Sequence, residues 1–143
     1  MKILFALLAV AAGVAVPFQG AANQGLKDQA GIGPALVVNT LIVLAGAVGL
    51  WLATGAKMTF FPAGTAWTLY LGGLFGFIII AAAAFVFPKL GAAWAVALMV
   101  FGQTVAALVI DHLGLLGMEK SPMTPQRLIG VALVACGVAV CRL

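Results

Sequence analysis

The sequence predicts an all-α integral membrane protein with five transmembrane helices. Three observations lead to this prediction: the composition, the spacing of the charged residues, and the placement of glycine and proline. Of 143 residues, 65% are hydrophobic and 7% are charged, and the mean hydropathy is +1.26. An ordinary soluble domain is about a quarter charged, and a fold of this size leaves roughly 30% of its unfolded surface exposed. Water could not solvate such a surface, and no connection between the predicted spans is long enough to form a water-facing catalytic domain.

Charged residues divide the chain into uncharged intervals that match membrane spans. A spanning helix needs about 20 apolar residues. The first four intervals, which end at Asp111, contain 24, 28, 31 and 21 residues, whereas the last, from Arg127 to Arg142, contains only 14. The fifth span is long enough only if it begins near Thr124. Thr124 and Pro125 suit that start, as an N-cap residue followed by proline at the first helical position.

Glycine and proline mark the ends of the spans. Gly31 and Pro34 begin the second helix, and Pro62 interrupts the chain before the third. The segment Pro88–Gly91 predicts a tight turn that makes the third and fourth helices antiparallel neighbours. The predicted helices, in a single membrane domain covering residues 1–143, are 3–25, 32–54, 66–87, 90–111 and 125–141.

The basic residues are almost evenly divided between the two sides of the membrane. Five spans put the termini on opposite sides, so one side receives four basic residues and the other three. Lysine and arginine on cytoplasmic loops normally orient a helical membrane protein, and this difference is small. Either the protein has one orientation, or both are made and an antiparallel pair forms ten helices with the inverted symmetry of many transporters. The two groups are Lys2, Lys57, Lys120 and Arg127, and Lys27, Lys89 and Arg142.

Four amide side chains inside the spans are candidates for a substrate-binding site. Gln19 and Asn23 stand four residues apart and share a helix face, just after Pro17, which weakens the local backbone hydrogen bonding. Asn39 and Gln103 are the second candidates. Polar groups at membrane depth usually face the bundle interior or a wet cavity. The alternative is that these amides bond neighbouring helices and only lock the packing.

One acid and one base lie at the margin of the apolar zone. Asp111 ends the fourth span and Arg127 lies one turn inside the fifth. We expect an ion pair with a structural role, and coupling of Asp111 to transport is the alternative. No phosphate-binding loop, metal-ligand cluster or nucleophile–base arrangement is present, so the sequence predicts no enzyme, no cofactor and no metal site. Without a basic run, a nucleic-acid partner is not expected.

Several motifs together resemble the YdcZ-like family of the drug/metabolite transporter (DMT) superfamily. They lie at residues 17–23, 71–76, 102–103, 109–117 and 127–130, and the segment from Asp111 to Gly117 is the most distinctive. The resemblance implies a five-helix unit equivalent to half of a ten-helix transporter. Members of this family look like dual-topology homodimers, oppositely oriented gene pairs or fused repeats.

The resemblance favours a multi-pass inner-membrane transporter of a small solute, working by alternating access as an antiparallel homodimer or with an oppositely oriented paralogue. Its expected partners are the lipid bilayer and the solute. A small dual-topology ion channel and a non-transporting accessory subunit are the alternatives. The related small multidrug exporters use a glutamate in the first helix to exchange protons for cationic drugs. Here that helix carries Gln19 and Asn23 and no acid, so the same exchange is doubtful.

Overall fold

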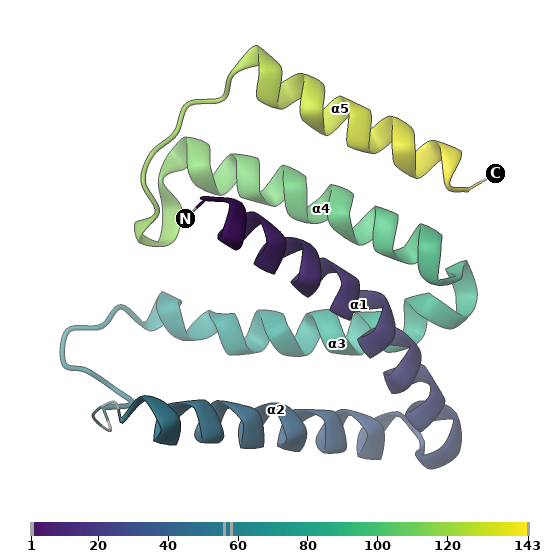
Figure 1. Cartoon of the computed structure of the whole chain (residues 1–143), viewed down its shortest axis with the longest axis vertical. Coiled ribbons are helices and arrows are strands. Elements are labelled where there is room, and N and C mark those ends of the chain that lie inside the picture. Colours follow the sequence, from purple (N-terminus) through teal and green to yellow (C-terminus); the bar gives the residue numbers. More distant parts are fainter. Residues whose placement is uncertain (1, 56, 58, 143) are drawn as a thin grey trace. The chain divides into compact units, whose positions relative to one another are not determined.

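The computed structural model describes residues 2–55, 57 and 59–142, and the regular elements in them are all helices (Figure 1). Of the described residues, 84% are helical. The first four α-helices are long and apolar enough to cross a membrane, whereas the fifth, with 16 residues, is shorter. The all-helical membrane fold is therefore confirmed, and a crossing by the fifth helix stays a prediction. The elements are α1 (Lys2–Ala30), α2 (Ile32–Thr54), the 3-10 turn η1 (Trp67–Tyr70), α3 (Leu71–Leu90), α4 (Ala92–Leu113), the 3-10 turn η2 (Leu115–Gly117) and α5 (Pro125–Val140).

Helix ends differ from the predicted ends where charges or prolines were taken as stops. α1 continues from the predicted end at residue 25 to Ala30, because charged side chains at a membrane surface do not break a helix. α3 begins at Leu71 after η1 instead of at residue 66. The predicted turn at Pro88–Gly91 is wrong, since Pro88 lies in the last turn of α3 and only Gly91 lies outside the helices. A proline removes one backbone donor, which the end of a helix tolerates.

Single glycines join α1 to α2 and α3 to α4 in the same conformation. Gly31 has φ 85° and ψ 164°, and Gly91 has φ 77° and ψ 158°. Each glycine N–H donates to the carbonyl four residues earlier, at 2.8 and 3.0 Å, and each carbonyl accepts from the amide of Ala35 or Ala95, at 3.2 and 3.1 Å. The joint therefore satisfies backbone groups that a helix end would otherwise leave unpaired. This region of φ and ψ is open essentially to glycine alone.

The chain divides into two compact units, each described here by itself. One unit runs from Gln19 to Phe85, and the other comprises the residues up to Phe18 and those from Val86 onward. The boundary within α1 follows Pro17 directly, where the helix lacks a backbone donor. The single membrane domain expected from the sequence stays a prediction.

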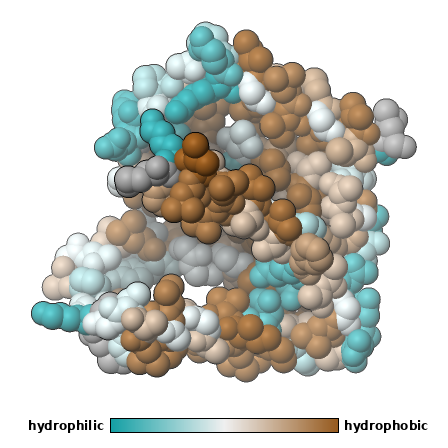
Figure 2. Space-filling view, in the orientation of Figure 1, coloured by the Kyte–Doolittle hydropathy of each residue, from teal (hydrophilic) through white to brown (hydrophobic). Residues whose placement is uncertain are grey.

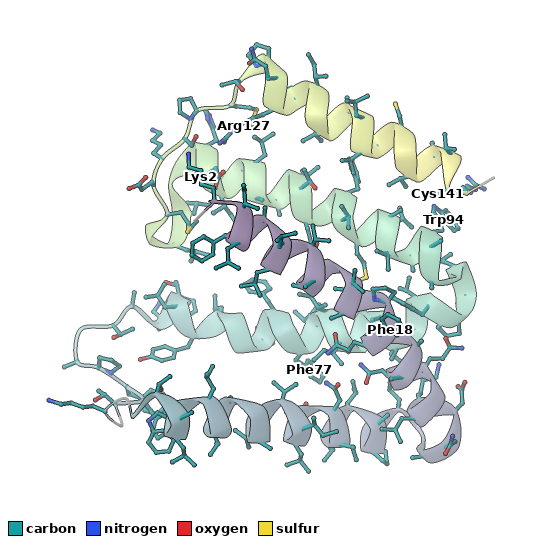
Figure 3. All side chains as sticks on the ribbon, viewed as in Figure 1. Lys2, Phe18, Phe77, Trp94, Arg127 and Cys141 are labelled. Atoms are coloured by element: carbon teal, nitrogen blue, oxygen red, sulfur yellow. The ribbon has the colours of Figure 1, made fainter. Side chains whose placement is uncertain are left out.

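In the Gln19–Phe85 unit, α2 and α3 lie side by side (Figure 1). The Phe77 ring extends from α3 toward α2 (Figure 3). Phe77 helps to line two apolar grooves, with volumes of about 220 and 310 Å³. Aromatic rings gather around the connection between these helices. Trp51 and Phe60 have ring centroids 6.1 Å apart, and the rings of Phe61 and Tyr70 are 5.5 Å apart. Aromatic residues at helix ends are typical of the membrane–water interface.

In the other unit, α4 and α5 pack against each other, and the connection between them is hydrogen-bonded to the end of α4. The N–H of Ser121 donates to the carbonyl of Asp111 at 2.7 Å, and the N–H of Met123 donates to His112 Nδ1 at 3.2 Å. The Thr124 hydroxyl accepts from the N–H of Arg127 at 3.4 Å. The predicted N-cap at Thr124 is thus confirmed.

Large apolar side chains cover the outside of the helices, and hydrophilic residues gather at the connections and helix ends (Figure 2). Ile3 is 77% exposed and Phe61 is 80% exposed. Soluble monomers rarely expose extended apolar surface, whereas lipid solvates it. Among the described residues, the buried hydrophobic side chains are mostly alanines that let helices approach closely: Ala35, Ala83, Ala84, Phe87 and Ala95.

We expect Gly91→Ala to lower the free energy of unfolding by about 1–3 kcal/mol, because a Cβ strains the backbone at this φ and ψ. Thermal unfolding of the purified protein in detergent measures the change. Gly102→Ala is the matched control, since Gly102 lies inside α4 with open space where a Cβ would be. That control should be neutral or stabilising by up to about 1 kcal/mol. Equal losses in both variants would contradict the assignment of strain to the joint.

Candidate functional site

Three of the four amides predicted for substrate binding line one cavity in the Gln19–Phe85 unit. Gln19 and Asn23 come from the second half of α1, and Asn39 comes from the second turn of α2. The cavity has a volume of about 180 Å³ and is open to the surface. Its other lining residues are apolar and comprise Ala22, Leu26, Val38 and Ile42. The site is therefore a small apolar recess with three amides and no ionisable side chain among its lining residues.

Two of these amides have buried nitrogens without a hydrogen-bond partner. Asn23 is 7% exposed, and the Nδ2 atoms of both Asn23 and Asn39 are buried and unpaired. A buried donor left unsatisfied costs about 1–3 kcal/mol, so such groups are rare in native structures and call for an explanation. The hypothesis that these amides only bond neighbouring helices is not supported by any partner within the described chain.

Gln103, the fourth predicted amide, lies elsewhere. It is exposed on α4, in the unit that contains α5. The structure therefore brings Gln19, Asn23 and Asn39 together within one unit, whereas Gln103 belongs to the other. Sequence position could not separate these cases, because each residue reads as an isolated amide within an apolar span.

The expected ion pair between Asp111 and Arg127 is present. The Arg127 guanidinium donates to Asp111 Oδ2 at 3.3 Å, and the side chains of Arg127 and Asp111 are 40% and 35% exposed. Both line a groove of about 230 Å³ between α4 and α5, which also includes Thr104. The Thr104 hydroxyl donates to the carbonyl of Val100 at 2.7 Å. Figure 3 shows Arg127 at the beginning of α5. The pair connects these two helices, in keeping with the structural role expected for it.

Lys27 is a residue whose role sequence reasoning missed. Its ammonium donates to the carbonyl of Ala84 on α3 at 3.0 Å and lies 6.0 Å from the ring centroid of Phe85. The carbonyl of Ala84 would normally accept from residue 88, which is proline and has no N–H. Lys27 thus supplies the hydrogen-bond donor that Pro88 cannot provide. The available signal was spacing, since Lys27 continues the series of Gln19 and Asn23 at intervals of four residues.

With this geometry described, comparison with known proteins identifies the family. A family model described as "Putative inner membrane exporter, YdcZ" matches residues 4–140. The chain belongs to the YdcZ family. No curated protein and no solved structure matches it.

Membership of the YdcZ family confirms the resemblance noted in the sequence and the location in the inner membrane. It also supports membrane transport as the general activity, because the family is one of membrane exporters and exporters are transport proteins, not enzymes. The helices that are long and apolar enough to cross a bilayer agree with this family. The cavity of Gln19, Asn23 and Asn39 lies within the matched region.

We expect Lys27→Met to lower the free energy of unfolding by about 1–3 kcal/mol, because the carbonyl of Ala84 is buried and would lose its donor. In a Pro88→Ala background the same change should cost much less, since a backbone N–H at position 88 then satisfies this carbonyl. Thermal unfolding of the four proteins in detergent completes the double-mutant cycle. Lys89→Met, which removes an exposed lysine from the last turn of α3, is the control. Additive losses in the cycle would refute the coupling.

Proposed function

We propose that this chain is an exporter of a small solute that works by alternating access as an antiparallel dual-topology dimer. The cavity of Gln19, Asn23 and Asn39 binds the solute. The observation that carries this proposal is the pair of buried, unpartnered amide nitrogens on Asn23 and Asn39. Polar side chains at membrane depth commonly mark the pathway of a solute. Asn23 and Asn39 have no hydrogen-bond partner among the described residues that would instead assign them to helix packing.

The proposed dimer rests on charge, length and surface. Four basic residues against three give the insertion machinery little orientation signal. A five-helix chain is half of the ten-helix assembly that inverted-repeat transporters use. Extensive apolar surface on the helices leaves room for a second copy as well as for lipid. The partner is therefore a second copy of this chain in the opposite orientation.

The amides determine what the cavity can do. An amide donates and accepts hydrogen bonds without changing charge, so binding needs no proton release from Gln19, Asn23 or Asn39. The ionisable pair Asp111–Arg127 lies in the other unit and is already satisfied. We therefore place solute recognition in the amide cavity and assign the ion pair to the packing of α4 and α5. Gln103 is not required for recognition in this proposal.

We expect the double variant Asn23→Ala/Asn39→Ala to lose solute binding without losing stability. A solute that raises the melting temperature of the wild type by binding the folded state should no longer do so. The melting temperature without solute should stay the same or rise, because two unpaired buried donors are removed. A thermal-shift screen of metabolites on the purified protein measures both quantities.

Gln126→Ala is the matched control for this screen, since Gln126 is an exposed amide at the beginning of α5. It should bind solutes as the wild type does. If the double variant keeps the solute-dependent shift, the cavity is not the binding site. A large fall in its melting temperature without solute would instead assign the amides to packing.

We expect Thr59→Lys/Ala63→Lys to fix the orientation and inactivate the homodimer. Both positions lie in the exposed connection between α2 and η1, on the side that already has four basic residues. The double variant increases the difference in the number of basic residues between the two sides of the membrane, and it should therefore direct this loop to the cytoplasm. Carboxyl-terminal reporters of each compartment should give two signals for the wild type and one for the variant. A single signal for the wild type would exclude the dual-topology dimer.

A further inference from the structure

The amide cavity has the chemistry of a site for a small organic anion, and this inference rests on the solute-binding role proposed above. We propose that it binds a monocarboxylate, with the Asn23 and Asn39 amides donating to the carboxylate oxygens. Asn23 is more than nine-tenths buried, and the unpaired groups on both side chains are donors. A ligand that supplies acceptor oxygens satisfies both, and hydrogen bonds to an ionised acceptor are the strong ones.

The charges around the cavity favour an anion over a cation. No acidic side chain lines it. Lys27 belongs to the helical turn that follows Asn23, with its backbone about 6 Å further along the axis, and its ammonium is held by the Ala84 carbonyl and the Phe85 ring. Asp28 lies 3.9 Å from that ammonium, but its side chain is 60% exposed, so solvent screens its charge. Because the Lys27 side chain is less exposed than that of Asp28, its positive charge is the less screened of the two and favours an anion in this part of the unit.

The walls and volume limit the rest of the ligand. Four of the seven lining residues are apolar, and the volume is about 180 Å³. One water molecule occupies about 30 Å³ of liquid, so the cavity has the volume of about six waters, which is enough for one small organic molecule. A short apolar body with one carboxylate fits these limits. A second charged group would find no partner among the lining residues.

Benzoate, benzamide and benzamidine test this assignment, because they share one shape and differ in charge. Binding to the purified full-length protein in nanodiscs is measured by isothermal titration calorimetry. We expect benzoate to bind about tenfold or more tightly than benzamidine, with benzamide between them. Asn39→Asp, which replaces a donor by a carboxylate of the same size, should reverse the order. Gln126→Glu, the same chemical change at an exposed site, should leave it unaltered.

The outcomes separate this inference from the proposed function. Benzamidine binding as tightly as benzoate, or none of the three binding, overturns the monocarboxylate assignment. The transport role stands in that case if the alanine variants still abolish the solute-dependent thermal shift. Benzoate binding that Asn39→Asp and Asn23→Ala leave unchanged overturns the placement of the anion in this cavity. Dissociation of the dimer in the Asn23→Ala variant would show that the amides join two copies, and would overturn the inference as well.

Discussion

The hydrogen bond from Lys27 to the carbonyl of Ala84 is the interaction on which the Gln19–Phe85 unit depends. It exists because Pro88 withholds the donor that this carbonyl would otherwise have, and because α1 runs on past its predicted end. The bond ties the end of α1 to α3, while the Gly31 joint ties it to α2. An α1 held at both places presents Asn23, one turn earlier, to the cavity it shares with α2.

Buried amides are a compromise between two demands on a transport protein in lipid. A permanent charge in the cavity would be costly at membrane depth, whereas a wholly apolar cavity could not select a polar solute. Unpaired amide donors raise the free energy of the empty site. Hydrogen bonds from these donors to the acceptors of a bound ligand would remove that penalty. In the proposed function the site would be organised before binding, while Lys27, which does not line the cavity, donates to a backbone carbonyl.

Hydropathy and the intervals between charges predicted the membrane fold and the approximate helices, because lipid imposes length and apolarity directly on the sequence. The same reasoning misjudged the end of α1, since charged side chains at a membrane surface do not break a helix, and the turn at Pro88, since the last turn of α3 tolerates a proline. Spacing by four residues correctly grouped Gln19 with Asn23. Their union with Asn39 required the arrangement of α1 and α2, which no local pattern encodes.

The one-residue joints at Gly31 and Gly91 also bear on how the chain enters the bilayer. A pair of helices joined by a single glycine can insert as a hairpin whose tip contains few polar residues. Around the first joint the translocated charges are only Lys27 and Asp28, and around the second only Lys89. In the dual-topology dimer proposed above, such tips would carry few charges across the membrane, so the joints themselves would add little to any bias of the chain toward one orientation.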